Sequence, residues 1–221
     1  MRKTIIMILL CIAGAILNIA LNKFLTVVGI GLPLYLDTIL TVSITFVGGL
    51  YWGCLTGALT NIIGHSINFW GWEGYLFTLC NIATAVITWL FMRFFPQELS
   101  LTWQRRIRGL RTYSSSQYFN NAMNKIIVLI LLSFALCIAM SILGGLISTF
   151  IQTISASTAD ETQLSALFGA SMFSEYPLVL MEILSRIPVN IIDRLIVAFC
   201  GFGIALIINR LMIFLLPKKS E

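Results

Sequence analysis

The sequence predicts an all-α polytopic membrane protein with six transmembrane helices and both termini in the cytoplasm. Of its 221 residues, 58% are hydrophobic and only 10% are charged, whereas soluble domains carry charges on about a quarter of their residues. The mean hydropathy is +0.95. Apolar runs recur along the chain, and about 20 such residues suffice to cross a bilayer. This composition excludes a soluble enzyme, a nucleic-acid-binding module and a disordered chain.

The apolar runs divide a single integral membrane domain, residues 1–221, into six predicted helices. The first run follows Arg2 and Lys3 and is too long for a cleavable signal peptide, so we expect it to be retained. Gly48 and Gly49 permit a tight reversal between the second and third helices. The helices are expected at residues 4–25, 34–50, 51–68, 75–95, 125–154 and 188–216.

The basic residues set the predicted orientation, because short cytoplasmic loops hold an excess of Lys and Arg. With the N-terminus inside, eleven of the fourteen basic residues lie on the cytoplasmic side and seven of the nine acidic residues lie outside. Two loops are long. Residues 96–124 interleave basic and apolar side chains. This pattern suits either a segment held at the membrane surface by anionic lipid or a partner protein, or a solvated basic loop. Residues 155–177 are expected to carry a short external helix.

The motifs of common catalytic sites are missing from the sequence. It contains no GxxxxGKS or GxxxxGKT phosphate loop, no HExxH and no GxSxG. A single histidine cannot build a metal site. We therefore predict that the chain is not an enzyme, that it carries no cofactor or metal, and that any ATP hydrolysis comes from partner subunits.

A stripe at four-residue spacing changes character along the third predicted helix. Its first half is the glycine series Gly49, Gly53 and Gly57, which suits close contact with another helix. Its second half is polar and consists of Asn61 and His65, with Asn68 one further turn on. These polar groups either bind a solute entering from outside or bond to one another inside the bundle.

An aromatic external loop follows this stripe directly. Aromatic rings can stack on a planar heterocycle, although Trp and Tyr also anchor helices at the membrane interface. We interpret four of its side chains as part of a substrate site: Trp70, Trp72, Glu73 and Tyr75.

The last predicted helix and the residues just before it are predicted to form another side of the substrate site. Pairs four residues apart share a helix face, and Glu182 with Arg186 forms either part of the site or a structural ion pair. Asp193 and Arg194 are adjacent and point in different directions. The predicted binding residues here are Glu182, Arg186, Asn190 and Asp193, joined by Asn81 on the fourth helix. Asp37 is interpreted as a carboxylate favouring a helix N-terminus.

These residues and this topology resemble the substrate-binding S component of energy-coupling factor (ECF) vitamin transporters. The resemblance rests on Leu36-Asp37-Thr38-Ile39, on the glycine-rich turn and the small residues of 48–61, and on the segments 77–82 and 188–193. It covers nearly the whole chain and implies an ECF S-component-like bundle.

The resemblance implies a subunit of an ATP-driven importer for a vitamin or related micronutrient, in a bacterial inner (plasma) membrane. Its partners would be a transmembrane coupling subunit and two ATPase subunits. Many members dock the coupling subunit through Ala-x-x-x-Ala on the first helix, whereas this sequence has Cys11-x-x-x-Ala15 and Gly14-x-x-x-Asn18. The residues expected to contact the partner are Cys11, Gly14, Ala15, Gly49, Gly53 and Gly57.

Two other functions compete with this reading. A membrane sensor module would use a similar bundle, although the sequence ends at Glu221 without an output domain. A secondary transporter would typically show an inverted repeat or a pair of broken helices, and the sequence shows neither. The aromatic and amide side chains of the predicted site favour a small planar or hydrogen-bonding solute.

Overall fold

The computed structural model of the chain describes residues 2–28, 35–68, 72–99, 101, 118–155 and 176–215, and every element in these ranges is helical. The predicted surface segment at 103–111 and most of the predicted loop at 155–177 lie outside them. The elements are α1 (Arg2–Val28), the 3-10 helix η1 (Leu36–Thr38), α2 (Ile39–Gly48), α3 (Leu50–Asn68), the 3-10 helix η2 (Trp72–Phe77), α4 (Thr78–Phe94), α5 (Pro96–Leu99), α7 (Tyr118–Ser155) and α9 (Leu178–Leu215).

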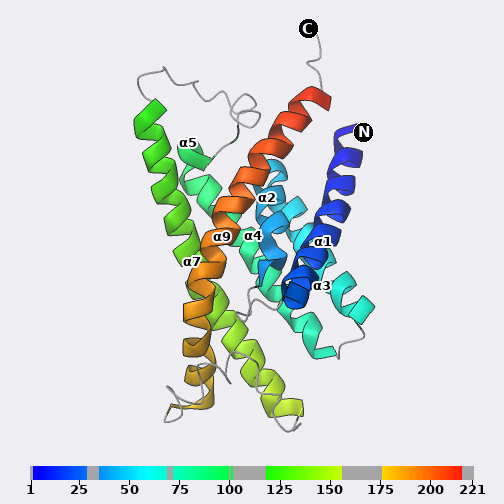
Figure 1. Cartoon of the computed structure of the whole chain (residues 1–221), viewed down its shortest axis with the longest axis vertical. Coiled ribbons are helices and arrows are strands. Elements are labelled where there is room, and N and C mark those ends of the chain that lie inside the picture. The colour runs from blue at the N-terminus through cyan, green and yellow to red at the C-terminus, as the bar shows by residue number, and fades with distance from the viewer. Residues whose placement is uncertain are drawn as a thin grey trace.

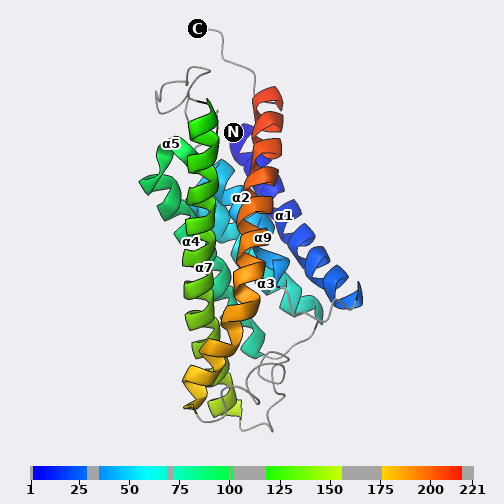
Figure 2. The ribbon, with the colours of Figure 1, turned by 60° about the vertical axis from the view of Figure 1, so that its left-hand side comes forward.

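The helices run alternately up and down one bundle (Figure 1). The start of α1 and the end of α9 lie at the same end of it, as Figures 1 and 2 both show. The prediction that both termini face one side of the membrane requires this arrangement. We call this end of the bundle the terminal end and the other the distal end.

Four helical segments among the described residues are long and apolar enough to cross a membrane: Thr4–Phe24, Trp72–Phe94, Ala122–Ile154 and Leu178–Phe214. The fold is therefore that of a helical membrane protein. The apolar segment Leu36–Gly48 is shorter, and α3 has 19 residues but carries the polar stripe that ends with His65. Six crossings remain a prediction.

The two longest helices begin earlier than the sequence predicts. Both α7 and α9 contain 38 residues, which corresponds to about 57 Å at 1.5 Å per residue. Pro188, expected to start the last helix, lies inside α9. Proline removes one backbone hydrogen bond and commonly breaks a helix. Here α9 continues through it while packing along α7 (Figure 2).

The short helix α2 is the centre of the bundle. All residues from Ile39 to Val47 are buried, because α2 packs against α1, α3, α4 and α9. Phe46 meets Phe202 of α9 edge to face, with 5.2 Å between ring centroids. Gly49 follows with a φ of 92°, a backbone conformation that glycine adopts without strain. It permits the reversal into α3 that the sequence predicts.

The small residues expected to contact a partner instead pack helices of this chain together. A β-carbon on Gly53 would overlap Thr45 Oγ1, and one on Gly57 would come within 3.1 Å of the Asn81 carbonyl oxygen. Only Gly49 is partly exposed. The structure therefore places the other five where a partner cannot reach them in this conformation: Cys11, Gly14, Ala15, Gly53 and Gly57.

Asn18 joins three helices deep in the bundle. Its side-chain oxygen accepts a hydrogen bond from the Leu40 backbone N–H at 3.0 Å, one of the N–H groups that the start of α2 leaves unpaired. Its amide nitrogen donates to Thr41 Oγ1 at 3.3 Å and to Thr60 Oγ1 at 3.1 Å. The polar side chain thus satisfies groups on both α2 and α3.

Replacing Gly53 by Ala is expected to lower the free energy of unfolding by about 1–3 kcal/mol, because overpacking forces neighbouring groups apart. The Gly203→Ala variant is the matched control, since a β-carbon at this helical glycine meets nothing within 4 Å. Thermal unfolding of both variants in detergent measures the difference. Equal melting temperatures for the two would contradict the tight packing of α3 on α2.

Replacing Asn18 by Ala is expected to cost about 1–3 kcal/mol of stability, because a buried backbone N–H loses its acceptor. Leu17→Ala at the neighbouring position is the control, since Leu17 is 53% exposed. Hydrogen exchange at the start of α2 reports the same loss locally. Unchanged protection of Leu40 in the Asn18→Ala variant would contradict the role assigned to Asn18.

Candidate functional site

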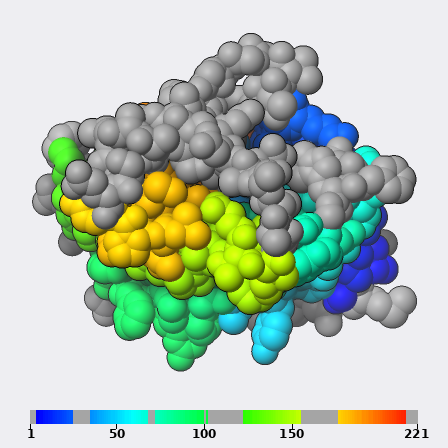
Figure 3. Space-filling view, turned by 90° about the horizontal axis from the view of Figure 1, so that it is seen from below, coloured from blue at the N-terminus to red at the C-terminus, as the bar shows by residue number. Residues whose placement is uncertain are grey.

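A cavity of about 300 Å³ lies inside the bundle. It lies between the ends of α1 and α3, the beginnings of α2 and α4, and the sides of α7 and α9. The cavity is therefore toward the distal end. Figure 3 views the molecule from that end and shows the last turns of α7 beside the first turns of α9. The lining residues are Asn22, Tyr35, Asp37, Thr38, Asn61, His65, Gly74, Phe77, Cys80, Asn81, Met140, Gly144, Arg186, Asn190 and Arg194.

One wall of the cavity is a single face of α9. Arg186, Asn190 and Arg194 recur every four residues, which places them on one side of the helix. Each donates a hydrogen bond to a hydroxyl on another element. Arg186 Nη2 donates to Ser148 Oγ, Asn190 Nδ2 to Ser141 Oγ at 2.9 Å, and Arg194 Nη1 to Thr38 Oγ1 at 2.8 Å. These contacts attach α9 to α7 and to η1.

Both guanidinium groups of this wall are neutralised by carboxylates of α9 itself. Arg186 Nη2 lies 3.4 Å from Glu182 Oε2, and Arg194 Nη2 lies 2.8 Å from Asp193 Oδ2. The second contact is a charge contact without hydrogen-bond alignment. Glu182 also accepts a hydrogen bond from Gln152 Nε2 at 2.8 Å. Pairing of this kind offsets the large cost of burying each charge.

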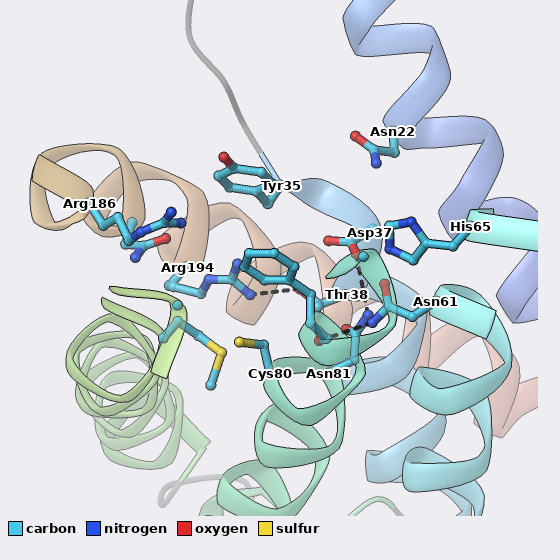
Figure 4. A pocket seen from close by; sticks show the side chains of 15 residues that line it. Asn22, Tyr35, Asp37, Thr38, Asn61, His65, Cys80, Asn81, Arg186 and Arg194 are labelled. Atoms are coloured by element: carbon cyan, nitrogen blue, oxygen red, sulfur yellow. Dashed lines mark hydrogen bonds between the residues drawn. The ribbon is translucent and has the colours of Figure 1, made fainter. Parts of the chain in front are cut away.

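The opposite wall comes from η1, α3 and the start of α4. Figure 4 shows Asp37, Asn61, Asn81 and His65 across the cavity from Arg186. Asn81 Nδ2 donates to Asp37 Oδ2 at 3.3 Å, and Asn61 Nδ2 donates to the Phe77 carbonyl at 3.1 Å. The side-chain oxygen of Asn81 is buried and has no hydrogen-bond partner among the residues that the structure describes. We call Asp37, Asn61 and Asn81 the acceptor wall.

A glycine allows η2 to lie directly on His65. A β-carbon at Gly74 would overlap the imidazole ring, and the neighbouring Tyr75 ring lies 5.7 Å from it, centroid to centroid. Tyr75 also shares a hydrogen bond with Ser66 at 3.1 Å. The start of α4 is thereby held against the last turns of α3, which keeps Asn61 and Asn81 close to each other.

The structure brings together only part of the predicted site. Asn61, His65, Asn81, Arg186 and Asn190 line the cavity. Glu182 and Asp193 are buried behind its wall, each paired with an arginine. Among the aromatic-loop residues, Trp72 and Tyr75 are 51% and 39% exposed and, like Glu73, do not line the cavity. Trp70 and the side chain of Asn68 lie outside the described part of the chain.

Other lining residues are absent from the predicted set. Arg194 continues the four-residue spacing of Arg186 and Asn190, so the sequence carried a usable signal for it. Asp37 lies in the first turn of η1, and its carboxylate accepts a hydrogen bond from Asn81. Met140 and Gly144 lie in the middle of a uniformly apolar run, and nothing in the sequence distinguishes them. In the regions that the structure describes, no group of three or more His, Cys, Asp or Glu side chains could hold a metal ion.

No family model matches the chain, and no curated protein or solved structure matches it.

Replacing Thr38 by Val is expected to destabilise the protein by about 1–3 kcal/mol, because Arg194 loses a buried acceptor while the side-chain shape is kept. Thr153→Val is the matched control, since this exposed hydroxyl bonds only to its own helix, at Thr149 O. Urea or thermal unfolding in detergent compares the two. A smaller loss for Thr38→Val than for Thr153→Val would contradict the anchoring of α9 on η1.

Proposed function

We propose that this chain is the substrate-binding membrane subunit of an ATP-driven ECF-type importer, and that it captures a vitamin or related small micronutrient at the external face of the cell membrane. The observation that carries the proposal is the cavity of about 300 Å³, lined by amide, guanidinium and carboxylate groups inside an apolar bundle. This volume lies at the lower end of the range for small-molecule sites.

The polar lining is costly to keep inside a membrane protein. Polar and ionisable side chains among apolar helices require partners, and they are a common mark of a substrate pathway. Asn81 has a buried side-chain oxygen to which no described residue donates a hydrogen bond, and a bound solute would satisfy it. A ligand site accounts for this arrangement better than helix packing does, because packing alone would not leave a polar-lined cavity.

The direction of capture follows from the charge distribution. Arg2, Lys3, Lys218 and Lys219 belong to the sequence at the two ends of the chain, and the start of α1 and the end of α9 share one end of the bundle. By the positive-inside rule that end faces the cytoplasm. The cavity, toward the distal end, then faces the outside. In the proposed topology α2 and α3 are the two further crossings.

Energy would be supplied by partners. The sequence contains no nucleotide-binding motif, so in this proposal a coupling subunit and two ATPase subunits drive import. The resemblance further suggests that the loaded subunit reorients in the bilayer. The pairing of Arg194 with Asp193 at 2.8 Å and of Arg186 with Glu182 at 3.4 Å supports this idea, because paired charges are less costly in hydrocarbon.

Native mass spectrometry of the purified full chain, together with co-purification of its cellular partners, tests the proposal. We expect a non-covalently bound small molecule, and ATPase subunits that co-purify with the chain. Asn190→Ala is expected to weaken retention of the molecule about tenfold, as loss of one well-placed hydrogen bond can do. Trp72→Ala is the control, because Trp72 is exposed and lies outside the cavity.

Two outcomes would contradict the proposal. Uptake of the identified molecule that persists after loss of the ATPase subunits would indicate a secondary transporter instead. A chain that retains no small molecule and no ATPase partner would not be an import subunit.

A further inference from the structure

The charges around the cavity do not balance. Two guanidinium groups, Arg186 and Arg194, face three carboxylates, and Glu182 and Asp193 each pair with one arginine. Asp37 is the third carboxylate and forms no ion pair within the described residues; its carboxylate accepts a hydrogen bond from the neutral Asn81 amide. The exposed Lys23 borders a smaller adjoining hollow together with Asp37, without an ion pair between them. When the two carboxylates behind the wall are counted with the lining, these five groups carry one excess negative charge.

Asp37 belongs to a wall that presents hydrogen-bond acceptors. The Asn61 and Asn81 amide nitrogens are both engaged, with Phe77 O and with Asp37. Each amide group keeps one further N–H, and the side-chain oxygens are the acceptors left for a ligand. Within the described residues the Asn81 oxygen has no hydrogen-bond partner, on a side chain that is 1% exposed. A carboxylate and an adjacent amide oxygen match a group that carries two or more N–H donors.

The arginine wall does not favour an anion. A negatively charged ligand there would also lie near Glu182 and Asp193, which already satisfy the two guanidinium charges. Arg194 acts on Asp37 only from beyond ion-pair distance, so a cation in direct contact with Asp37 would gain a closer attraction, which is strong where water is scarce. The acceptor wall and the charge balance therefore point to the same ligand chemistry.

We propose that the substrate is a small organic cation whose charged end carries at least two N–H donors, of the ammonium or amidinium type, and that this end binds Asp37 and Asn81. This inference rests on the proposed function and specifies the substrate class of the same site. The remaining lining includes Tyr35, Phe77 and Met140, which suit an apolar or aromatic body. Binding would give Asp37 a counter-ion at ion-pair distance.

Three probes of nearly the same shape test the charge preference: benzamidine (a cation), benzamide (neutral) and benzoate (an anion). Their binding to the purified full chain at neutral pH is measured by isothermal titration calorimetry. We expect benzamidine to bind at least about tenfold more tightly than benzamide, and benzoate to bind most weakly. This ranking in the unmodified protein needs no variant to fold.

The Asp37→Asn variant assigns the preference to one residue. It keeps the side-chain size and removes the charge, so benzamidine and benzamide are expected to bind it with affinities within about twofold of each other. Glu73→Gln is the matched control, because Glu73 does not line the cavity, and it should keep the preference of the unmodified chain. A preference that survives Asp37→Asn would overturn the assignment.

Other outcomes separate this inference from the proposed function. Tighter binding of benzoate, or no binding of any probe at millimolar concentration, overturns the cationic class. A neutral or acidic molecule found bound by native mass spectrometry, together with ATPase partners, would do so while leaving the importer intact. Benzamidine selectivity without ATPase partners would support the cation site and contradict the importer.

Discussion

A guanidinium group can be buried among apolar helices only if its charge is neutralised and its N–H groups find acceptors. Two such groups on α9 impose this requirement on the whole bundle. Arg186 reaches Ser148 on α7, and Arg194 reaches Thr38 in η1. The position of α9 against its neighbours, and hence the shape of the cavity, follows from where these acceptors lie.

The acceptor wall, opposite α9, contains no guanidinium group and is held in place by neutral contacts. Asn18 fixes the start of α2 through the Leu40 N–H, and Gly57 lets α3 approach the backbone at Asn81 closely. These neutral contacts set the position of Asp37 without bringing a cation of the described residues within ion-pair distance of it. The arginines of the α9 wall are therefore paired with carboxylates, whereas the acceptor wall keeps a carboxylate without an ion pair among the described residues. This asymmetry is expected of a ligand-binding site.

Much of the architecture is predictable from apolar runs and the distribution of basic residues, because both reflect the bilayer directly. Helix ends are less predictable: Pro188 looks like a helix start, yet packing against α7 carries α9 through it. Asn61 and Asn190, which the sequence singles out by their spacing to other polar residues, line the cavity. Trp72 does not line it, because the same aromatic side chain serves interface anchoring and ligand stacking, and only the fold separates the two.

The two arginine–carboxylate pairs of α9 are both internal to that helix. If α9 slides or turns against α7, each cation travels with its own counter-ion, and no opposite charges are pulled apart. The motion would instead exchange hydrogen bonds, among them those to the hydroxyls of Ser141, Ser148 and Thr38 and the one from Gln152 to Glu182. Helix α9 can thus move against its neighbours without separating either of its ion pairs.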